Sequence, residues 1–244
     1  MYRIFASLIL FCTTLVVSSQ SISAQPVTVP AGLAPGEQYR LAFVTSTTTY
    51  ASASNILYYN NFVNNLANTA GSPLDGLSTW TAIGSTDSIA ARDNTLTHPG
   101  VNPDYPIYNL AGDLVASNNA ALWNTASVAL ANPIDIFESG LLAPPNTYVW
   151  TGTLSDGTPN SLGGGALGDG SGFARDGSTT GGISASDGWI YYGYDGQLIH
   201  EFSMYAMSGV LTVPTPEPSS IVLAGLAAAG LAVAAIRKRR IASH

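Results

Sequence analysis

Five Asp-Gly pairs lie between residues 156 and 196, and clustered carboxylates on a flexible backbone could bind calcium. The aspartates that we expect to supply the oxygen ligands are Asp156, Asp169, Asp176 and Asp187. Their spacing matches neither an EF-hand loop nor the glycine-rich calcium repeat. Asp-Gly is also a common turn sequence, because glycine accepts positive φ and aspartate bonds back to the backbone. The sequence therefore leaves two interpretations open, simple turns and a calcium site.

A short aromatic segment, WIYYGY at residues 189–194, could contact sugars. Its candidates are Trp189, Tyr191 and Tyr192, since an exposed Trp or Tyr ring can stack on a sugar ring. The alternative is that alternate residues of the segment pack into the core, because tryptophan is mostly buried in folded proteins.

No arrangement typical of a catalytic site stands out in the sequence. No pair stands at metal-ligand spacing among the histidines His98, His200 and His244. The GDGSG segment has one glycine too many for a serine-protease nucleophile, and Asp135 and Glu138 form an acid pair of a kind common in acidic chains. We therefore predict that the protein is not an enzyme, and an enzyme acting on polysaccharide is the alternative.

Residues 1–24 have the three parts of a secretory signal peptide. A positive start, an apolar stretch and a small-residue cleavage site follow one another as Arg3, Ile4–Val17 and Ser23-Ala24. We expect cleavage after Ala24 and export of the rest of the chain. The one cysteine, Cys12, lies in this segment, so the mature chain would have neither disulfides nor thiolate metal sites.

Charged residues are few and unevenly placed. The chain has 8 lysines and arginines against 15 aspartates and glutamates, a formal net charge of −7. One arginine lies in the signal peptide and four cations lie near the C-terminus, so the domain between keeps only Arg40, Arg92 and Arg175. A surface this acidic argues against nucleic acid as a partner, because phosphate needs Lys and Arg to neutralise it. It permits divalent cations and favours solubility outside the cell.

The C-terminal segment, residues 214–244, combines prolines, an apolar run and a basic cluster. Residues 219–236 are uncharged and are near the lower length limit for a helix that spans a bilayer. Basic residues after such a helix favour the cytoplasmic side, so the preceding domain would lie outside the inner membrane. These orienting residues, at 237–240, are Arg237, Lys238, Arg239 and Arg240.

The order of VPTPEPSS, an apolar helix and RKRR resembles the PEP-CTERM sorting signal of Gram-negative bacteria. Pro216, Glu217 and Pro218 match the motif directly. The resemblance implies that an exosortase, a membrane transpeptidase-like enzyme, reads this triplet and that the helix and basic end are then removed. It also implies a final place at the cell surface or in the extracellular matrix, often beside exopolysaccharide. The alternative is a permanent single-pass anchor.

Short strands, one early helix and a long loop are the elements that must position these residues. Alternating apolar residues predict a strand over residues 39–46. A helix is predicted next, with Ser54 as N-cap and Gly71 as its C-terminal stop. Its buried face is predicted to be Ile56, Tyr59, Val63, Leu66 and Ala70. Its other face is rich in asparagine, which we expect to contact solvent.

Further strands are predicted over residues 77–85, on both sides of a turn at 111–113 and over 147–153. The segments DGWIYYG and FSMYAMSGVLTV are also predicted to be strands, with His200 in a strand as well. The glycine-rich stretch from Ser155 to Ser186 shows almost no apolar content, so a long loop is predicted there. A loop of this length is usually functional or disordered.

Several of these pieces together resemble the endostatin-like branch of C-type-lectin-like domains. They are YRLAFVTS, the helix after it, LSTWTAIGS with ARDN, YVWTGTLSDGT and DGWI…MYAMSGVL. The resemblance covers most of residues 39–213 and implies an α+β domain built of short strands with an early helix and a long Gly-rich loop. We expect the exported domain to extend over residues 25–213, before the C-terminal transmembrane helix. The usual sugar-and-calcium tripeptides are missing, so the resemblance assigns sugar binding to no residue of this chain.

These observations predict an exported surface or matrix protein with a structural or adhesive role, processed by an exosortase through its tail. Membrane contact would come through the tail during transit, and exopolysaccharide is the expected partner outside the cell. The alternative is a glycan-binding, lectin-like module that uses the Ser155–Ser186 loop, with or without calcium. No other cofactor is expected.

Overall fold

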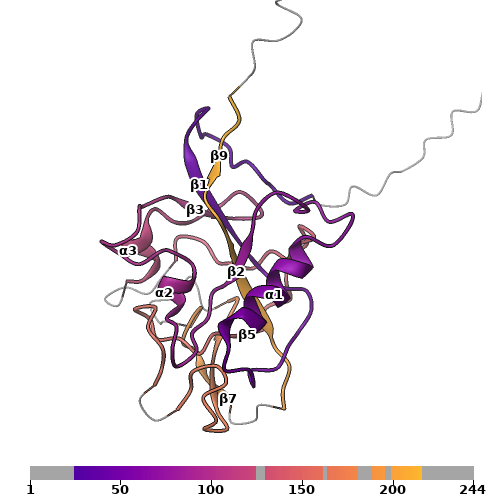
Figure 1. Ribbon diagram of the computed structural model, residues 1–244. Coiled ribbons are helices and arrows are strands. Elements are labelled where there is room, and N and C mark those ends of the chain that lie inside the picture. The colour runs from indigo at the N-terminus through magenta and orange to yellow at the C-terminus, as the bar shows by residue number, and fades with distance from the viewer. Residues whose placement is uncertain (1–24, 125–129, 162–163, 181–187, 196–198, 216–244) are drawn as a thin grey trace, which may run out of the picture.

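The structure is a computed structural model that describes residues 25–124, 130–161, 164–180, 188–195 and 199–215 (Figure 1). The predicted signal peptide and the apolar run at 219–236 lie outside these residues. Within the described ranges, no helix has the length and apolar character needed to cross a membrane. The predicted transmembrane helix therefore stays a prediction.

A mixed sheet forms the centre of the described part of the chain, with nine strands in it (Figure 1). The strands are β1 Gln38–Val44, β2 Trp80–Ala82, β3 Ile107–Asn109, β4 Leu114–Ala116, β5 Tyr148–Trp150, β6 Ala174–Ser178, β7 Gly193–Asp195, β8 Ser203–Ser208 and β9 Leu211–Thr212. Seven of them follow the order β4-β3-β1-β8-β5-β6-β7, while β2 pairs with β8 and β9 pairs with β1. The pairs β1–β3 and β5–β8 are parallel, and β1 and β8 are antiparallel.

Most of the predicted strands are present. The predictions at 39–46, around 111–113 and at 147–153 are confirmed as β1, β3 with β4, and β5, and the 77–85 segment contains β2. The FSMYAMSGVLTV segment contains β8 and β9. The helices among the described residues are α1 Ile56–Ala67, α2 Ala91–Asn94 and α3 Asn119–Leu122. A sheet-rich, mixed architecture with few helices is the α+β arrangement that the sequence predicts.

Helix α1 differs from its prediction at both ends. Its N-cap is Asn55 rather than Ser54, because the Asn55 side chain accepts a hydrogen bond from the backbone N–H of Leu57. The helix ends before Ala70 and Gly71 are reached, since the chain leaves the helical conformation after Ala67. The residues buried along it are Ile56, Tyr59, Val63 and Ala67.

The asparagine-rich face of α1 does not simply contact solvent, as the sequence suggested. The Trp80 N–H donates to Asn64 Oδ1 at 3.0 Å, and the Ala82 N–H donates to Asn60 Oδ1 at 2.9 Å. Strand β2 pairs with β8 through its other edge. Two side chains, four residues apart on one helix face, therefore take the place of a neighbouring strand and satisfy backbone groups that would otherwise lack partners.

We expect the substitution Asn64→Ala to lower the free energy of unfolding by about 1–3 kcal/mol, because it leaves the Trp80 N–H without its acceptor. Urea unfolding followed by tryptophan fluorescence measures the effect. The matched control is Asn61→Ala, an asparagine that is exposed on the same helix. Equal stabilities of the two variants would contradict the role given to Asn64.

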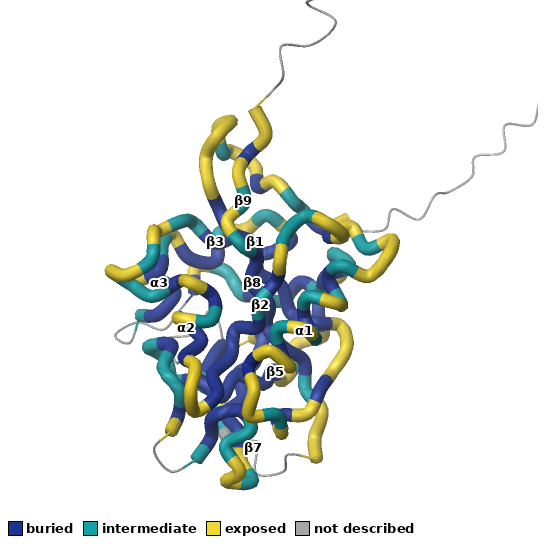
Figure 2. The backbone as a smooth tube through the Cα atoms, in the orientation of Figure 1, coloured by how far each residue is buried: buried dark blue, intermediate teal, exposed yellow. Residues whose placement is uncertain are grey.

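The core is divided into two apolar clusters, one on each side of the strands. Figure 2 shows the buried segments running through the middle of the domain. Because alternate residues of a strand point to opposite faces, Leu41 and Phe43 of β1 join the cluster that contains α1, while Ala42 and Val44 join the other. Fully buried tryptophans lie in both clusters. The domain thus has a core that needs no disulfide.

The sequence predicts one long loop from Ser155 to Ser186, but this prediction is wrong in part because strand β6 lies within the stretch. Strand β6 is buried along its length and pairs with β5 on one side and β7 on the other. Its sequence, ARDGS, lacks the β-branched and aromatic residues typical of strands, so its backbone partners decide its conformation. The DGWIYYG segment also differs: residues 188–190 form a turn, and β7 begins only at Gly193.

Candidate functional site

Two aspartates of the Asp-Gly pairs hold turns. Asp156 Oδ1 accepts hydrogen bonds from the N–H and the hydroxyl of Thr158. The carboxylate of Asp169 accepts from the N–H groups of Gly165 and Ser171. Burial alone would raise the pKa of Asp169, but these hydrogen bonds favour the charged form, and the pKa lies below its usual value. Both carboxylates make the contacts expected of turn residues.

The third described aspartate, Asp176, lies in strand β6 and is buried. Among the residues that the structure describes, no three or more His, Cys, Asp and Glu side chains gather where they could hold a metal ion. Asp187 lies outside the described residues. Calcium binding by the set Asp156, Asp169, Asp176 and Asp187 therefore stays a prediction.

The three aromatic candidates occupy different environments. Trp189 is only 1% exposed, and its ring lies 5.8 Å from the Trp123 ring and 5.9 Å from the Tyr205 ring, so it belongs to the core and offers no face to a sugar. The guanidinium of Arg175 lies 3.5 Å above the Tyr191 ring and also donates to its hydroxyl. Tyr192, by contrast, is 60% exposed. Of the three, Tyr192 has the open ring.

Tyr192 is the outer member of a row of four rings that sequence reasoning missed. The ring centroids of Tyr192 and Tyr148 are 6.1 Å apart, and Tyr148 stacks on Phe202 at 5.3 Å. Phe202 in turn lies 4.4 Å from Trp150. Tyr148 is 44% exposed whereas Trp150 is fully buried, so this aromatic row runs from solvent into the core.

Strand β5 and one isolated bridge position the aromatic row. Tyr148 and Trp150 lie two residues apart on β5, so their side chains share one face. Phe202 and Thr49 each donate their N–H to the carbonyl of the other, and the Trp150 Nε1–H donates to the same Thr49 carbonyl at 3.0 Å. The alternating pattern in TYVWTGT was a sequence signal that Tyr148 and Trp150 share one face of a strand. The contact with Phe202 joins segments far apart in the sequence and had no such signal.

Polar residues from two segments, 48–50 and 199–201, lie next in sequence to Thr49 and Phe202, which position the aromatic row. His200 is exposed in a bend, not in the predicted strand, and its ring lies 6.1 Å from that of Phe202. Glu201 is exposed and accepts a hydrogen bond from the Thr48 hydroxyl at 3.2 Å. The Tyr50 phenol also forms a hydrogen bond with Glu201, and this hydrogen bond raises the pKa of the phenol. Segments 48–50 and 199–202 thus supply a carboxylate, hydroxyls and an imidazole.

The arginines of the domain bind the protein's own backbone. Arg40 is buried and donates to carbonyls at Thr95, Leu96 and Ser208, and burial lowers the pKa of its guanidinium. Arg175 is also buried and donates to the Gly193 carbonyl. Arg92 is half-buried and donates to the Asp156 carbonyl. In the described residues, the guanidinium groups are therefore used inside the fold, and carboxylates dominate the surface charge.

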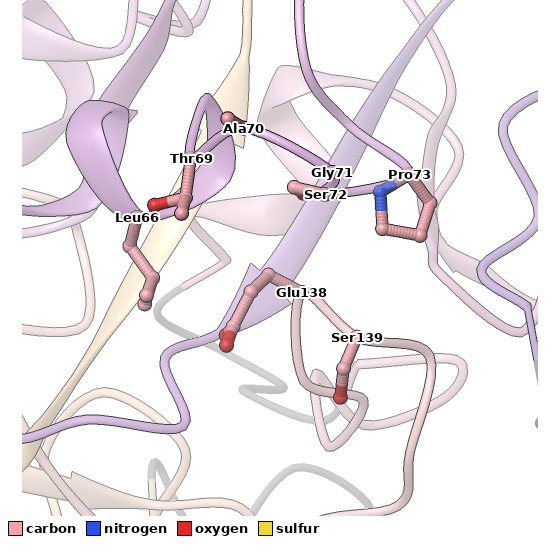
Figure 3. Close-up of a pocket in the computed structure, with 8 residues that line it drawn as sticks. All are labelled: Leu66, Thr69, Ala70, Gly71, Ser72, Pro73, Glu138 and Ser139. Atoms are coloured by element: carbon pink, nitrogen blue, oxygen red, sulfur yellow. The ribbon is translucent and has the colours of Figure 1, made fainter.

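A pocket of 340 Å³ lies where the end of α1 faces residues 138–139 (Figure 3). It is lined by Leu66, Thr69, Ala70, Gly71, Ser72, Pro73, Glu138 and Ser139. The carboxylate of Glu138 accepts hydrogen bonds from both the N–H and the hydroxyl of Ser46. Asp135, whose pKa burial raises, is not among the lining residues. The structure does not bring the predicted acid pair together in this pocket.

The described domain ends at the edge of the sheet. The Val213 N–H donates to the Glu37 carbonyl at 2.9 Å, and the Gly36 N–H donates to the Val213 carbonyl at 3.0 Å. Val213 is buried, whereas Pro214 and Thr215 are exposed. The last hydrogen bonds of the sheet thus lie immediately before the proline-rich segment. In Figure 1, β9 stands at the top of the domain and β7 at the bottom.

The segment that begins after Val213 matches the model of a known family over residues 214–240. It is a PEP-CTERM protein-sorting motif. The resemblance of the C-terminal segment to a PEP-CTERM signal is confirmed, and Pro216, Glu217 and Pro218 lie within the match, while the endostatin-like resemblance of the domain stays a prediction. A PEP-CTERM tail implies export, anchoring in the membrane during transit and processing by an exosortase in a Gram-negative bacterium. No curated protein matches the chain.

Proposed function

We propose that this exported protein has a structural or adhesive role at the cell surface or in the extracellular matrix. The observation that carries the proposal is the direct junction of the PEP-CTERM motif to the sheet at Val213. An exosortase acting on this junction would deliver a complete folded domain without a spacer. Its two apolar clusters and acidic surface suit such a domain to remaining folded and soluble outside the cell.

The proposed role needs no catalysis. The domain would act by binding and packing, as a C-type-lectin-like domain placed beside exopolysaccharide in a biofilm matrix. The early helix α1 and the short strands support this proposed domain type. Calcium bound by Asp156, Asp169, Asp176 and Asp187 stays a separate proposal, as a ligand that would assist the domain.

Deletion of the gene, followed by complementation, tests the proposed role. We expect the deletion strain to lose matrix mass and surface adhesion, and the full chain to restore both. A chain that stops at Thr215 is the matched control, because it keeps the described domain but lacks the PEP-CTERM triplet. It should be exported without restoring the phenotype. Unaltered matrix and adhesion in the deletion strain would reject the proposal.

A second candidate function is binding of glycans by the domain itself. The aromatic row supports it, because Tyr148 and Tyr192 expose rings next to exposed polar residues. This candidate differs from a purely structural role in requiring a defined binding surface.

A further inference from the structure

We propose that the aromatic row is a calcium-independent binding site for a neutral, hydroxyl-rich polysaccharide that stacks on Tyr148 and Tyr192. The inference deepens the proposed function and rests on it, since it names the surface through which the exported domain would contact polysaccharide. Of the residues that the sequence suggested it keeps only Tyr192, and it adds Tyr148, which the fold brings beside Tyr192.

The rings have the exposure and rigidity that such a site needs. Tyr148 and Tyr192 come from separate segments yet lie 6.1 Å apart, and each is partly open to solvent. Tyr148 is held in place because Phe202 stacks on it at 5.3 Å with an interplanar angle of 27°. Phe202 is fixed in turn by its backbone bridge to Thr49. A preorganised tyrosine gives a large contact area at low cost in conformational entropy.

The surroundings provide hydrogen bonds for sugar hydroxyls. Glu201 precedes Phe202 in the chain, and its exposed carboxylate can accept hydrogen bonds from a sugar while it accepts one from Thr48. The tyrosine hydroxyls of the row can donate or accept. Flat apolar faces beside hydroxyls and a carboxylate match the apolar ring faces and hydroxyl edges of a pyranose.

Charge decides between classes of polymer. The buried Arg40 and Arg175 and the half-buried Arg92 are engaged with backbone carbonyls, while Glu201 adds negative charge near the row. An anionic polysaccharide or a nucleic acid would be repelled, since every arginine of the described residues is already engaged with backbone carbonyls. A stable protein partner needs about 800 Å² on each side, whereas an aromatic side chain contributes about 150–250 Å² even when fully buried. Two partly exposed tyrosines therefore fit a single sugar chain better.

The position of the row fits its proposed ligand. Tyr192 immediately precedes β7, at the bottom of the domain in Figure 1, while the chain leaves for the PEP-CTERM tail after β9 at the top. The row therefore lies at the end of the domain opposite β9.

Affinity electrophoresis of the full chain in detergent micelles tests the site. The gels contain neutral polymers (β-1,4-glucan, β-1,3-glucan, dextran or galactomannan) or anionic polygalacturonate, each with and without EGTA. We expect retardation by at least one neutral polymer, unchanged by EGTA, and none by polygalacturonate. Tyr192→Ala should weaken binding about tenfold, and Tyr192→Phe should retain it, because the ring carries the contact.

Phe173→Ala is the matched control, because Phe173 is 47% exposed but makes no ring contact with the row in the described structure. Tyr148→Ala should repeat the loss, and melting temperatures check that each variant is folded. Failure of every neutral polymer to retard the chain, binding of polygalacturonate alone, or unchanged binding by both tyrosine variants would overturn the inference. Restored matrix mass with Tyr192→Ala in the deletion strain would overturn it while leaving the proposed structural role intact.

Discussion

Replacing Pro216, Glu217 and Pro218 together by alanine is expected to move the protein from the cell surface or matrix to the inner membrane. The triplet is the part of the PEP-CTERM motif that an exosortase would read, and from the sequence we expect its prolines to favour an extended, accessible segment. Without it, the apolar run at 219–236 should stay attached to the domain and anchor it. Most of the processed form should be lost.

Immunoblots of membrane, surface and medium fractions measure this effect, since the uncleaved chain is larger than the processed one. Pro214→Ala is the matched control: it removes a proline from the same segment but leaves the triplet unchanged. Normal amounts of processed protein at the surface in the triple variant would show that sorting does not depend on these residues.

Gly177→Ala is expected to have the largest effect on stability, with a loss of at least about 3 kcal/mol in the free energy of unfolding. A Cβ atom at Gly177 would overlap the carbonyl oxygen of Trp189 and lie 2.7 Å from its carbonyl carbon. The backbone cannot shift freely, because the Ser178 N–H donates to the Gly188 carbonyl at 2.8 Å and β6 is paired on both sides. The overlap must therefore be relieved by disrupting the sheet.

Gly170→Ala is the matched control from another Asp-Gly pair. Gly170 has φ +79°, and an added Cβ would meet nothing within 4 Å, so only backbone strain of about 1–2 kcal/mol is expected. Urea unfolding followed by tryptophan fluorescence compares the two variants, and resistance to proteolysis reports on any that fails to fold. A smaller loss for Gly177→Ala than for Gly170→Ala would contradict the packing described at β6.

The two glycines show how alike sequences can serve different structural purposes. Asp169-Gly170 makes a turn, as Asp-Gly commonly does. Asp176-Gly177 lies within a buried strand, where the missing side chain makes room for a carbonyl from another segment. The pair alone cannot reveal this difference, because the second role depends on Trp189, which approaches only in the folded protein.

Features recorded in local patterns could be predicted from the sequence. Strands β1, β3, β4, β5 and β8 follow from alternation and turn residues, and most of the buried face of α1 follows from its spacing. The sorting tail is local as well, since a proline-rich segment, an apolar run and basic residues follow one another in the sequence. Such signals need no tertiary contact in order to be recognised.

Only the tertiary structure decided which side chains meet. It placed Trp189 in the core and left Tyr192 open beside Tyr148. It also stacked Phe202 on Tyr148 of β5 and paired the Phe202 backbone with Thr49. It also turned the asparagines of α1 toward β2, and it built β6 from residues with little strand propensity. The physical reason is common to these cases: each depends on backbone or ring contacts between segments far apart in the chain, which short-range periodicity does not encode.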